Sequence, residues 1–374
     1  MKKIFNTQYS MFNTQRPTTN HQPSSTNLQP ILWGILHGLN DFVAGFMLAN
    51  YTYNNPSSQA VLYIVIYSII GFGGQLPIGF WVDAKKQIKP FAQASLLLLP
   101  LSIVAFFINA EAGIICSGIA SAFVHVTGGA ICLQVHNDKV TPLSLFTAPG
   151  VFGLTLGGIF GQYSTTPLIA IGVLVIITAF LILKNNLPTY QVQKNEQSQL
   201  DSHDYIMLGL LLVMCFRSFI FDVINTIAQQ YSDGILIIGI SAFLGKIVGG
   251  FIADKIGWKK YVYITLPIAL LLFHFGKQNI YALGFGIACL QSSVPITLLL
   301  MSRSLPIYPA TATALSLGAS VAIAGLPLFL ISDKQKIVKQ FNNNYITALV
   351  FVLLFIAAYF IFKQLSKPKK IIST

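Results

Sequence analysis

Twelve apolar stretches follow one another along this chain of 374 residues, and they limit its possible folds more than any other feature. A helix needs about 20 apolar residues to cross the hydrocarbon core of a bilayer, whereas a barrel strand needs about ten residues of alternating polarity. No such alternation is present, so the pattern predicts transmembrane helices. The stretches lie at residues 31–51, 60–82, 90–109, 112–135, 144–165, 167–184, 205–231, 234–254, 259–275, 279–301, 306–331 and 345–363.

The composition agrees with a membrane location. Hydrophobic residues make up 54% of the chain and charged residues only 9%, whereas about a quarter of the residues in a soluble domain are charged. A soluble fold of this length could not bury so much apolar surface. The sequence therefore predicts an all-α integral membrane protein that is surrounded by lipid.

The order of the stretches predicts two bundles of six helices each. Residues 1–30 are polar and lack the early apolar region of a signal peptide, so we expect a disordered cytoplasmic tail. Residues 31–184 form the first bundle, 185–204 a polar cytoplasmic linker, 205–363 the second bundle and 364–374 a second cytoplasmic tail.

The basic residues indicate the orientation. If the N-terminus is inside, seventeen of the 23 lysines and arginines fall on the inner side, four fall outside, and two lie within spans. The positive-inside rule then predicts a multi-pass plasma (inner) membrane protein with both termini in the cytoplasm. Because the net charge of +12 is dispersed over segment ends, it does not indicate a nucleic-acid partner.

No cofactor, metal or enzymatic chemistry is predicted. Each cysteine lies within an apolar stretch and none belongs to a metal-binding spacing; they are Cys116, Cys132, Cys215 and Cys289. The chain has no phosphate-binding loop of the Walker type and no Ser/His/Asp arrangement that stands out. We expect a protein that is not an enzyme and functions as a monomer.

The two halves repeat a short motif, as transporter halves often do. Gly79 and Asp83 end the second predicted helix, Gly250 and Asp254 end the eighth, and basic residues follow both pairs. The small glycines permit close helix packing. Each aspartate can accept hydrogen bonds from the N-terminus of a neighbouring helix.

This motif resembles the G-x-x-x-D-R/K-x-G-R/K-R/K loop signature of the major facilitator superfamily. The second copy matches through Gly250, Asp254, Lys255, Gly257, Lys259 and Lys260. The first copy keeps Gly79 and Asp83 but has Ala84 and Lys86 where a basic residue and a glycine are expected. The resemblance implies transport by alternating access, with both copies of the motif at the cytoplasmic gate.

Three shorter motifs are similar to those of fosmidomycin-resistance-type drug exporters. They are His37-Gly-Leu-Asn40-Asp41 in the first helix, Phe123-Val-His125 in the fourth and Arg217-Ser218 in the seventh. A glycine-rich fifth helix adds to the resemblance, although Gly157-Gly158 stands where that family has Gly-Pro. The resemblance implies export and places His125 in the site.

Ionisable residues within the spans are candidates for coupling, because they are costly in a bilayer unless they serve a cavity or a partner. His37 and Asp41 lie four residues apart, hence on one face of a helix. With His125 they form a candidate proton-coupling set, because histidine titrates near neutral pH. A structural hydrogen bond between helices is the alternative.

The remaining polar residues are candidate substrate ligands: Arg217, Asn40, Asp222, Lys246 and Gln75. Arg217 offers a planar set of donors to an anion. Alternatively, Arg217 and Lys246 form ion pairs with Asp41 or Asp222. His274 is expected at the membrane interface.

The leading hypothesis is a secondary transporter that exports a small polar or anionic compound in exchange for protons. The first alternative is uptake of an anionic nutrient by proton symport. The second is a receptor or assembly subunit that has the same fold and does not transport.

Overall fold

The structure is a computed structural model, and it describes most of the chain between the tails. Its described residues are 28–56, 58–135, 138–185, 187, 188, 190 and 203–330, together with Lys336, Val352, Ile356 and Tyr359. Outside the described residues lie the twelfth predicted span (345–363) apart from Val352, Ile356 and Tyr359, almost all of the first predicted tail, the second tail and most of the linker.

The described part of the first half contains the six predicted spans. Its elements are α1 (Gln29–Asn54), α2 (Ser58–Ser68), the π-helical segment η2 (Ile69–Gly73), α3 (Gln75–Lys85), α4 (Lys89–Ile108), α5 (Ala110–Val135), α6 (Thr141–Phe160) and α7 (Thr166–Lys184). The second predicted helix thus consists of α2, η2 and α3 in succession.

The second half contains five further spans within the described residues. Its elements are α8 (His203–Ala228), α9 (Gly234–Ile256), α10 (Trp258–Phe275), α11 (Ile280–Gln291), α12 (Val294–Ser304), α13 (Pro309–Thr313), the π-helical segment η3 (Ala314–Ala319) and α14 (Ser320–Leu330). In the described part of the chain, nine helical stretches are long and apolar enough to cross a membrane. The all-α membrane architecture is confirmed.

Three predicted spans are not the continuous α-helices that the sequence pattern suggests. The second and eleventh spans each contain a π-helical segment, and the two segments contact each other. Gly318 in η3 lies against Phe72 and Gln75, with no room for a side chain of its own. The tenth span is interrupted at Ser292 and Ser293, because Pro295 has no N–H to donate and its ring displaces the preceding turn.

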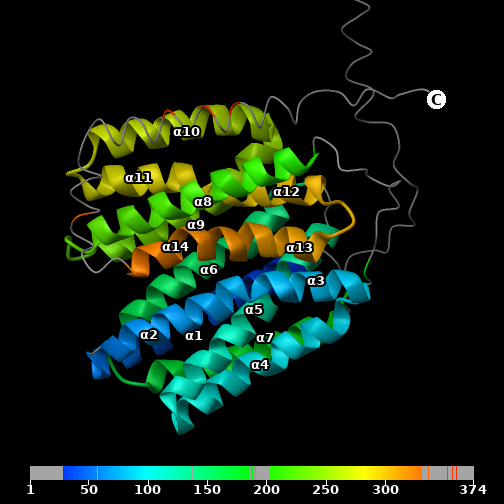
Figure 1. Ribbon diagram of the computed structural model, residues 1–374, viewed down its shortest axis with the longest axis vertical. Helices are drawn as coiled ribbons and strands as arrows, with labels where there is room; N and C mark the ends of the chain where they lie inside the picture. The colour runs from blue at the N-terminus through cyan, green and yellow to red at the C-terminus, as the bar shows by residue number, and fades with distance from the viewer. Residues whose placement is uncertain are drawn as a thin grey trace, which may run out of the picture.

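The helices run roughly parallel and form two adjoining groups (Figure 1). In this view α1 to α7 lie in the lower part and α8 to α14 in the upper part. The halves are joined on one side where α6 packs on α9 and α12, and on the other where α13 packs on α3 and α5 and α14 packs on α2. Within the first half, α1 and α6 pack against each other along most of their lengths.

The loop after each motif aspartate contains one residue with a left-handed backbone. In the second copy this is Gly257, with φ of 89°; in the first it is Lys86, with φ of 53°. Both residues thus have a positive φ, but ψ is 35° at Lys86 and 134° at Gly257, so the first copy keeps only the sign of φ where the glycine is absent.

The backbone at Gly257 predicts that a side chain is costly there. A Cβ would meet no atom of the described residues within 4 Å, so the cost of Gly257→Ala arises from the backbone. We expect a loss of about 1–3 kcal/mol in the free energy of unfolding, measured as a lower thermal midpoint in detergent. Gly158→Ala is the matched control, because Gly158 also has open space but lies within helix α6, where alanine is favoured. Equal midpoints for the two variants would contradict the prediction.

Candidate functional site

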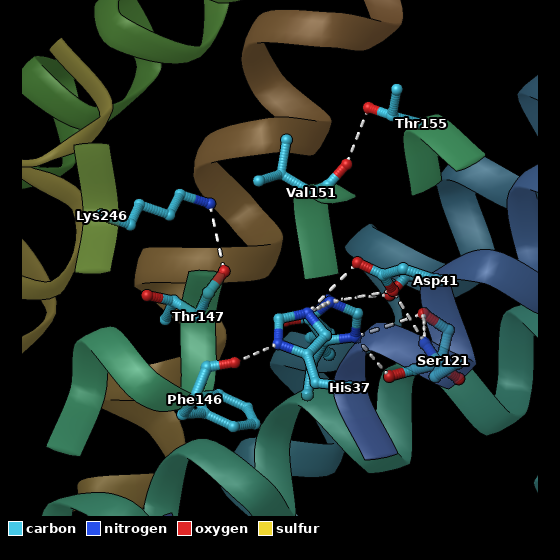
Figure 2. A network of polar contacts seen from close by, with 12 residues as sticks. His37, Asp41, Ser121, Phe146, Thr147, Val151, Thr155 and Lys246 are labelled. Carbon is cyan, nitrogen blue, oxygen red and sulfur yellow. Dashed lines mark hydrogen bonds and ion pairs between the residues drawn. The ribbon is translucent and has the colours of Figure 1, made fainter. Parts of the chain in front are cut away.

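Two histidines and an aspartate meet between α1 and α5, and we call them the histidine cluster. His37 and Asp41 lie on α1 and His125 on α5. The Nε2 atoms of His37 and His125 are 2.9 Å apart. Asp41 Oδ2 lies 3.2 Å from His37 Nε2, and Asp41 Oδ1 lies 3.6 Å from His125 Nε2. The three predicted coupling residues are thus brought together, with both histidines buried (Figure 2).

The hydrogen bonds of the two histidines fix where their protons lie. His37 Nδ1 is 2.8 Å from the Phe146 carbonyl oxygen, and His125 Nδ1 is 2.8 Å from the Ser121 carbonyl oxygen. A carbonyl oxygen only accepts, so both Nδ1 atoms carry a proton and donate. In two neutral rings both Nε2 atoms would then be acceptors facing each other. Their 2.9 Å hydrogen bond therefore requires one additional proton, whose charge Asp41 balances.

The same three side chains are the one His/Cys/Asp/Glu group in the described part of the chain that can hold a metal ion. Zinc would require two histidine nitrogens at about 2.0–2.1 Å each, hence about 3.3 Å from each other in a tetrahedral site. The observed 2.9 Å is instead the length of a direct N–H···N hydrogen bond. The geometry fits a shared proton better than a metal ion.

Asn40, Ser121 and Tyr67 surround the cluster on its other side. Asn40 Nδ2 donates to Asp41 Oδ1 at 2.9 Å and to Ser121 Oγ at 3.2 Å, and the Tyr67 hydroxyl donates to Ser121 Oγ at 3.2 Å. Asn40, predicted as a substrate ligand, thus contacts the histidine cluster through Asp41. Sequence reasoning missed Ser121 and Tyr67. Ser121 lies four residues before His125, and that helical spacing is the one sequence signal for it.

Close packing of α6 against α1 covers the cluster. A Cβ at Gly150 would overlap the imidazole of His37 and the carboxylate of Asp41. Only glycine allows α6 to approach this far, so the glycine-rich sequence of this helix has a steric reason at the site.

The second half contributes two buried cations. Lys246 on α9 donates from Nζ to the Thr147 carbonyl oxygen at 3.2 Å, and Arg217 on α8 donates from Nη1 to Thr297 Oγ1 at 2.8 Å. Lys246 is 8% exposed and Arg217 is 5% exposed, so both have little access to bulk water. Figure 2 shows Lys246 pointing from α9 toward α6 on the side of the histidine cluster.

Neither cation forms an ion pair with a described residue. The described ion pairs within 4 Å are His37–Asp41, His125–Asp41 and Arg303–Asp138. Lys246 nevertheless interacts electrostatically with both Asp41, which attracts it, and Arg217, which repels it. The predicted alternative, in which Asp41 pairs directly with Arg217 or Lys246, is therefore not what the structure shows. Thr147 Oγ1, beside the carbonyl that Lys246 contacts, is buried and has no hydrogen-bond partner among the residues that the structure describes.

The other predicted ligands take different positions. Gln75 is fully buried where the halves meet and donates from Nε2 to the Gly71 carbonyl oxygen at 2.9 Å, away from any contact with the cations. Asp222 is partly buried on α8, five residues beyond Arg217. His274 packs edge-on against Phe275 at the end of α10.

The two motif aspartates cap helices of the opposite half. Asp83 accepts hydrogen bonds from the backbone of Ala310 at 3.1 Å, and from the backbone and hydroxyl of Thr311 at 2.7 and 2.6 Å. We call this the first capping contact. Because Asp83 ends the second span and α13 begins the eleventh, the contact joins the two halves.

The second capping contact mirrors the first. Asp254 accepts hydrogen bonds from the backbone of Val140 at 2.8 Å, and from the backbone and hydroxyl of Thr141 at 2.9 and 2.6 Å. The motif glycines permit both approaches, since a Cβ at Gly79 would lie 2.9 Å from the Ala310 oxygen and one at Gly250 would overlap Ser144. Lys255 is exposed beside this contact.

Two helical halves that cap each other's helices, that are built from helices long enough to cross a bilayer and that enclose buried charges are typical of a multi-pass membrane transporter. The chain belongs to the Major Facilitator Superfamily, whose sequence profile matches residues 31–275. Family membership indicates a transporter rather than an enzyme. No curated protein matches the chain.

Solved transporter structures share the fold at low sequence identity. The E. coli fucose:proton symporter FucP has a TM-score of 0.68 at 14% identity, over 91% of this chain and 99% of its own. The human organic anion transporter MFSD10 (TETRAN) has a TM-score of 0.61 at 15% identity, over 89% of this chain and 100% of its own. A bacterial homologue of the iron transporter ferroportin, in its outward-facing state, has a TM-score of 0.62 at 13% identity, over 92% of this chain and 100% of its own. These likenesses establish the fold alone.

Proposed function

We propose that the protein is a proton-coupled secondary transporter of a small anionic compound. The observation that supports this most is the pair of buried cations, Arg217 and Lys246, which have no carboxylate within 4 Å among the described residues. An isolated charge in a low-dielectric interior is costly, and it is tolerated where a ligand provides a counter-charge or where water solvates it. An anion between α8 and α9 would provide it.

The histidine cluster is the proposed proton site. Its two facing Nε2 atoms require one proton, and Asp41 stabilises the resulting charge. When the proton leaves, the Asp41 carboxylate remains as a net negative charge within range of Lys246. Lys246 is then attracted toward Asp41 and becomes less available to an anion. Protonation of the cluster and anion binding therefore favour each other.

This mutual support favours symport, in which proton and anion move together. The second candidate is export in exchange for protons. It is suggested by the resemblance of the motif His37-Gly-Leu-Asn40-Asp41 and the two other short motifs to those of drug exporters. It requires the proton to weaken anion binding rather than to strengthen it. The seventeen-to-four distribution of basic residues supports cytoplasmic termini in either case.

Alternating access would use the two capping contacts. Both lie at the end of the molecule that the charge distribution places in the cytoplasm, so intact contacts hold the halves together on that side. Their opening would expose the cations and the histidine cluster to the cytoplasm. The site would thus be reached from one side at a time.

Purified protein in liposomes tests the proposal. A panel of radiolabelled small anions is offered with and without an imposed pH gradient, and an internal pH indicator follows proton movement. We expect accumulation of at least one anion that depends on the gradient. Anion binding that tightens as the pH falls indicates symport, and binding that weakens indicates exchange. Proton coupling would be refuted if the protein transports one or more of the anions and the pH gradient affects the transport of none of them.

The second capping contact predicts a defect in rate rather than in affinity. Asp254→Asn removes the charge that stabilises the N-terminus of α6, an effect of about 0.5–2 kcal/mol. We expect turnover to fall about tenfold while substrate affinity stays within a few-fold, measured by initial rates and equilibrium binding in the same preparation. Asp138→Asn is the control, because its carboxylate is 92% exposed and forms only a long ion pair. A large loss of affinity at unchanged turnover would contradict this role.

A further inference from the structure

The linker between the halves reaches the first capping contact. Tyr190, a linker residue, donates its hydroxyl to Asp83 Oδ1 at 2.6 Å. Asp83 thereby accepts four hydrogen bonds, three from the start of α13 and one from the linker. The side chain that joins the two halves is thus also bound by the segment that connects them in the chain.

The described part of the linker is anchored on the first half. The side chain of Gln29, at the start of α1, donates to the Asn185 carbonyl oxygen at 2.5 Å. Leu187 and the ring of Tyr190 pack against the hydrophobic core. These contacts hold Asn185, Leu187 and Tyr190 on the cytoplasmic end of the first half and position the Tyr190 hydroxyl next to Asp83.

The two capping contacts differ in burial and in the additional hydrogen bond from Tyr190. Asp83 is 4% exposed, whereas Asp254 is exposed and, within the part of the chain that the structure describes, accepts hydrogen bonds only from Val140 and Thr141. The first copy of the loop motif is also the one that departs from the family signature, at Ala84 and Lys86. The linker tyrosine therefore supplements the copy with the weaker match.

The Tyr190 hydroxyl can act as a hydrogen-bond donor to Asp83 at any physiological pH. Burial and the adjacent Asp83 carboxylate raise the pKa of the Tyr190 phenol well above its ordinary value. The phenol therefore stays protonated at any physiological pH and can always donate to Asp83. A hydrogen bond to a carboxylate is stronger than one between neutral groups.

We infer that Tyr190 is a positioning residue of the transport cycle, through which the linker holds the first capping contact closed and sets how often the cytoplasmic side opens. This inference rests on the proposed function, because it assumes that the first capping contact opens during transport. It assigns the linker an active role in addition to connecting the halves.

Distances between spin labels on the two halves test the inference. Lys89, at the start of α4, and Lys260, near the start of α10, are exposed and belong to different halves, so each can be replaced by a labelled cysteine in a cysteine-free background. Tyr190→Phe keeps the ring and removes the hydroxyl. We expect the ratio of closed to open cytoplasmic distances to fall about tenfold, as for the loss of one hydrogen bond to a charged group.

Two further variants distinguish the possible failures. Tyr308→Phe is the matched control, since Tyr308 is a nearby, half-exposed tyrosine with no hydrogen bond to Asp83, and it should leave the distances unchanged. Asp83→Asn should open the first capping contact regardless of the linker. If Asp83→Asn shifts the distances and Tyr190→Phe does not, the linker inference is wrong and the capping role stands. If neither shifts them, the capping role itself is wrong.

A transport readout separates positioning from simple stability. Anion affinity measured in Tyr190→Phe should stay within a few-fold of the wild type, because the hydroxyl contacts neither cation. The balance between inward and outward transport rates should change. An equal loss of affinity and rate in both directions would indicate a general folding defect and would overturn the inference.

Discussion

Asp41→Asn is expected to abolish accumulation driven by a pH gradient while leaving substrate exchange measurable. The carboxylate oxygens of Asp41 lie 3.2 and 3.6 Å from the two Nε2 atoms that share the proposed proton. A unit charge about 4 Å away is worth about 4 kcal/mol at an effective dielectric constant of 20. Its loss would weaken proton binding by roughly three orders of magnitude.

The neutral amide keeps the size of the side chain and costs less in a membrane than a charge, so the variant should fold. Proton uptake coupled to anion transport, followed with a pH indicator in liposomes, is the measurement. Asp233→Asn provides the control, because Asp233 is an exposed carboxylate before α9. Normal gradient-driven transport in Asp41→Asn would exclude this carboxylate from coupling and would favour a structural role for the cluster.

Arg217→Lys is expected to weaken anion binding at least tenfold without altering proton movement through the histidine cluster. The substitution keeps the positive charge but removes the planar donors that bind an oxyanion in a bidentate manner. It also removes the geometry that allows Nη1 to contact Thr297. Arg217→Gln, which removes the charge as well, should have the larger effect.

Equilibrium binding of the transported anion at several pH values is the measurement for this prediction. Arg303→Lys is the matched control, because Arg303 is 41% exposed and its ion pair with Asp138 is long. Exposed pairs of this kind contribute little. If the anion binds Arg217→Lys as it binds the wild type, then Arg217 stabilises α8 against α12 and the proposed anion site is wrong.

The Asp41→Asn variant also tests whether proton and anion move in the same direction or in opposite directions. In symport, Asp41→Asn should alter the pH dependence of anion binding, because Lys246 no longer responds to a charge at Asp41. In exchange, low pH should compete with the anion in the wild type, and that competition should be lost in the variant.

Several properties of this protein follow from local sequence alone. Apolar stretches of about 20 residues predict membrane helices because each helix satisfies its own backbone hydrogen bonds in lipid. The pairs Gly79/Asp83 and Gly250/Asp254 indicate two related halves, and the spacing of His37 and Asp41 places both side chains on one helix face. These features depend only on residues that are neighbours in the chain.

The tertiary structure alone decided which of these residues meet. His125 reaches His37 across 88 positions and Asp83 reaches Thr311 across 228, distances over which no helical period relates two residues. Helix packing also left Arg217 and Lys246 without a carboxylate partner among the described residues and brought Tyr190 of the linker onto Asp83. The composition of a span specifies that it enters the membrane. Which face meets which neighbour depends on close packing by small residues such as Gly150, and only the assembled bundle defines that packing.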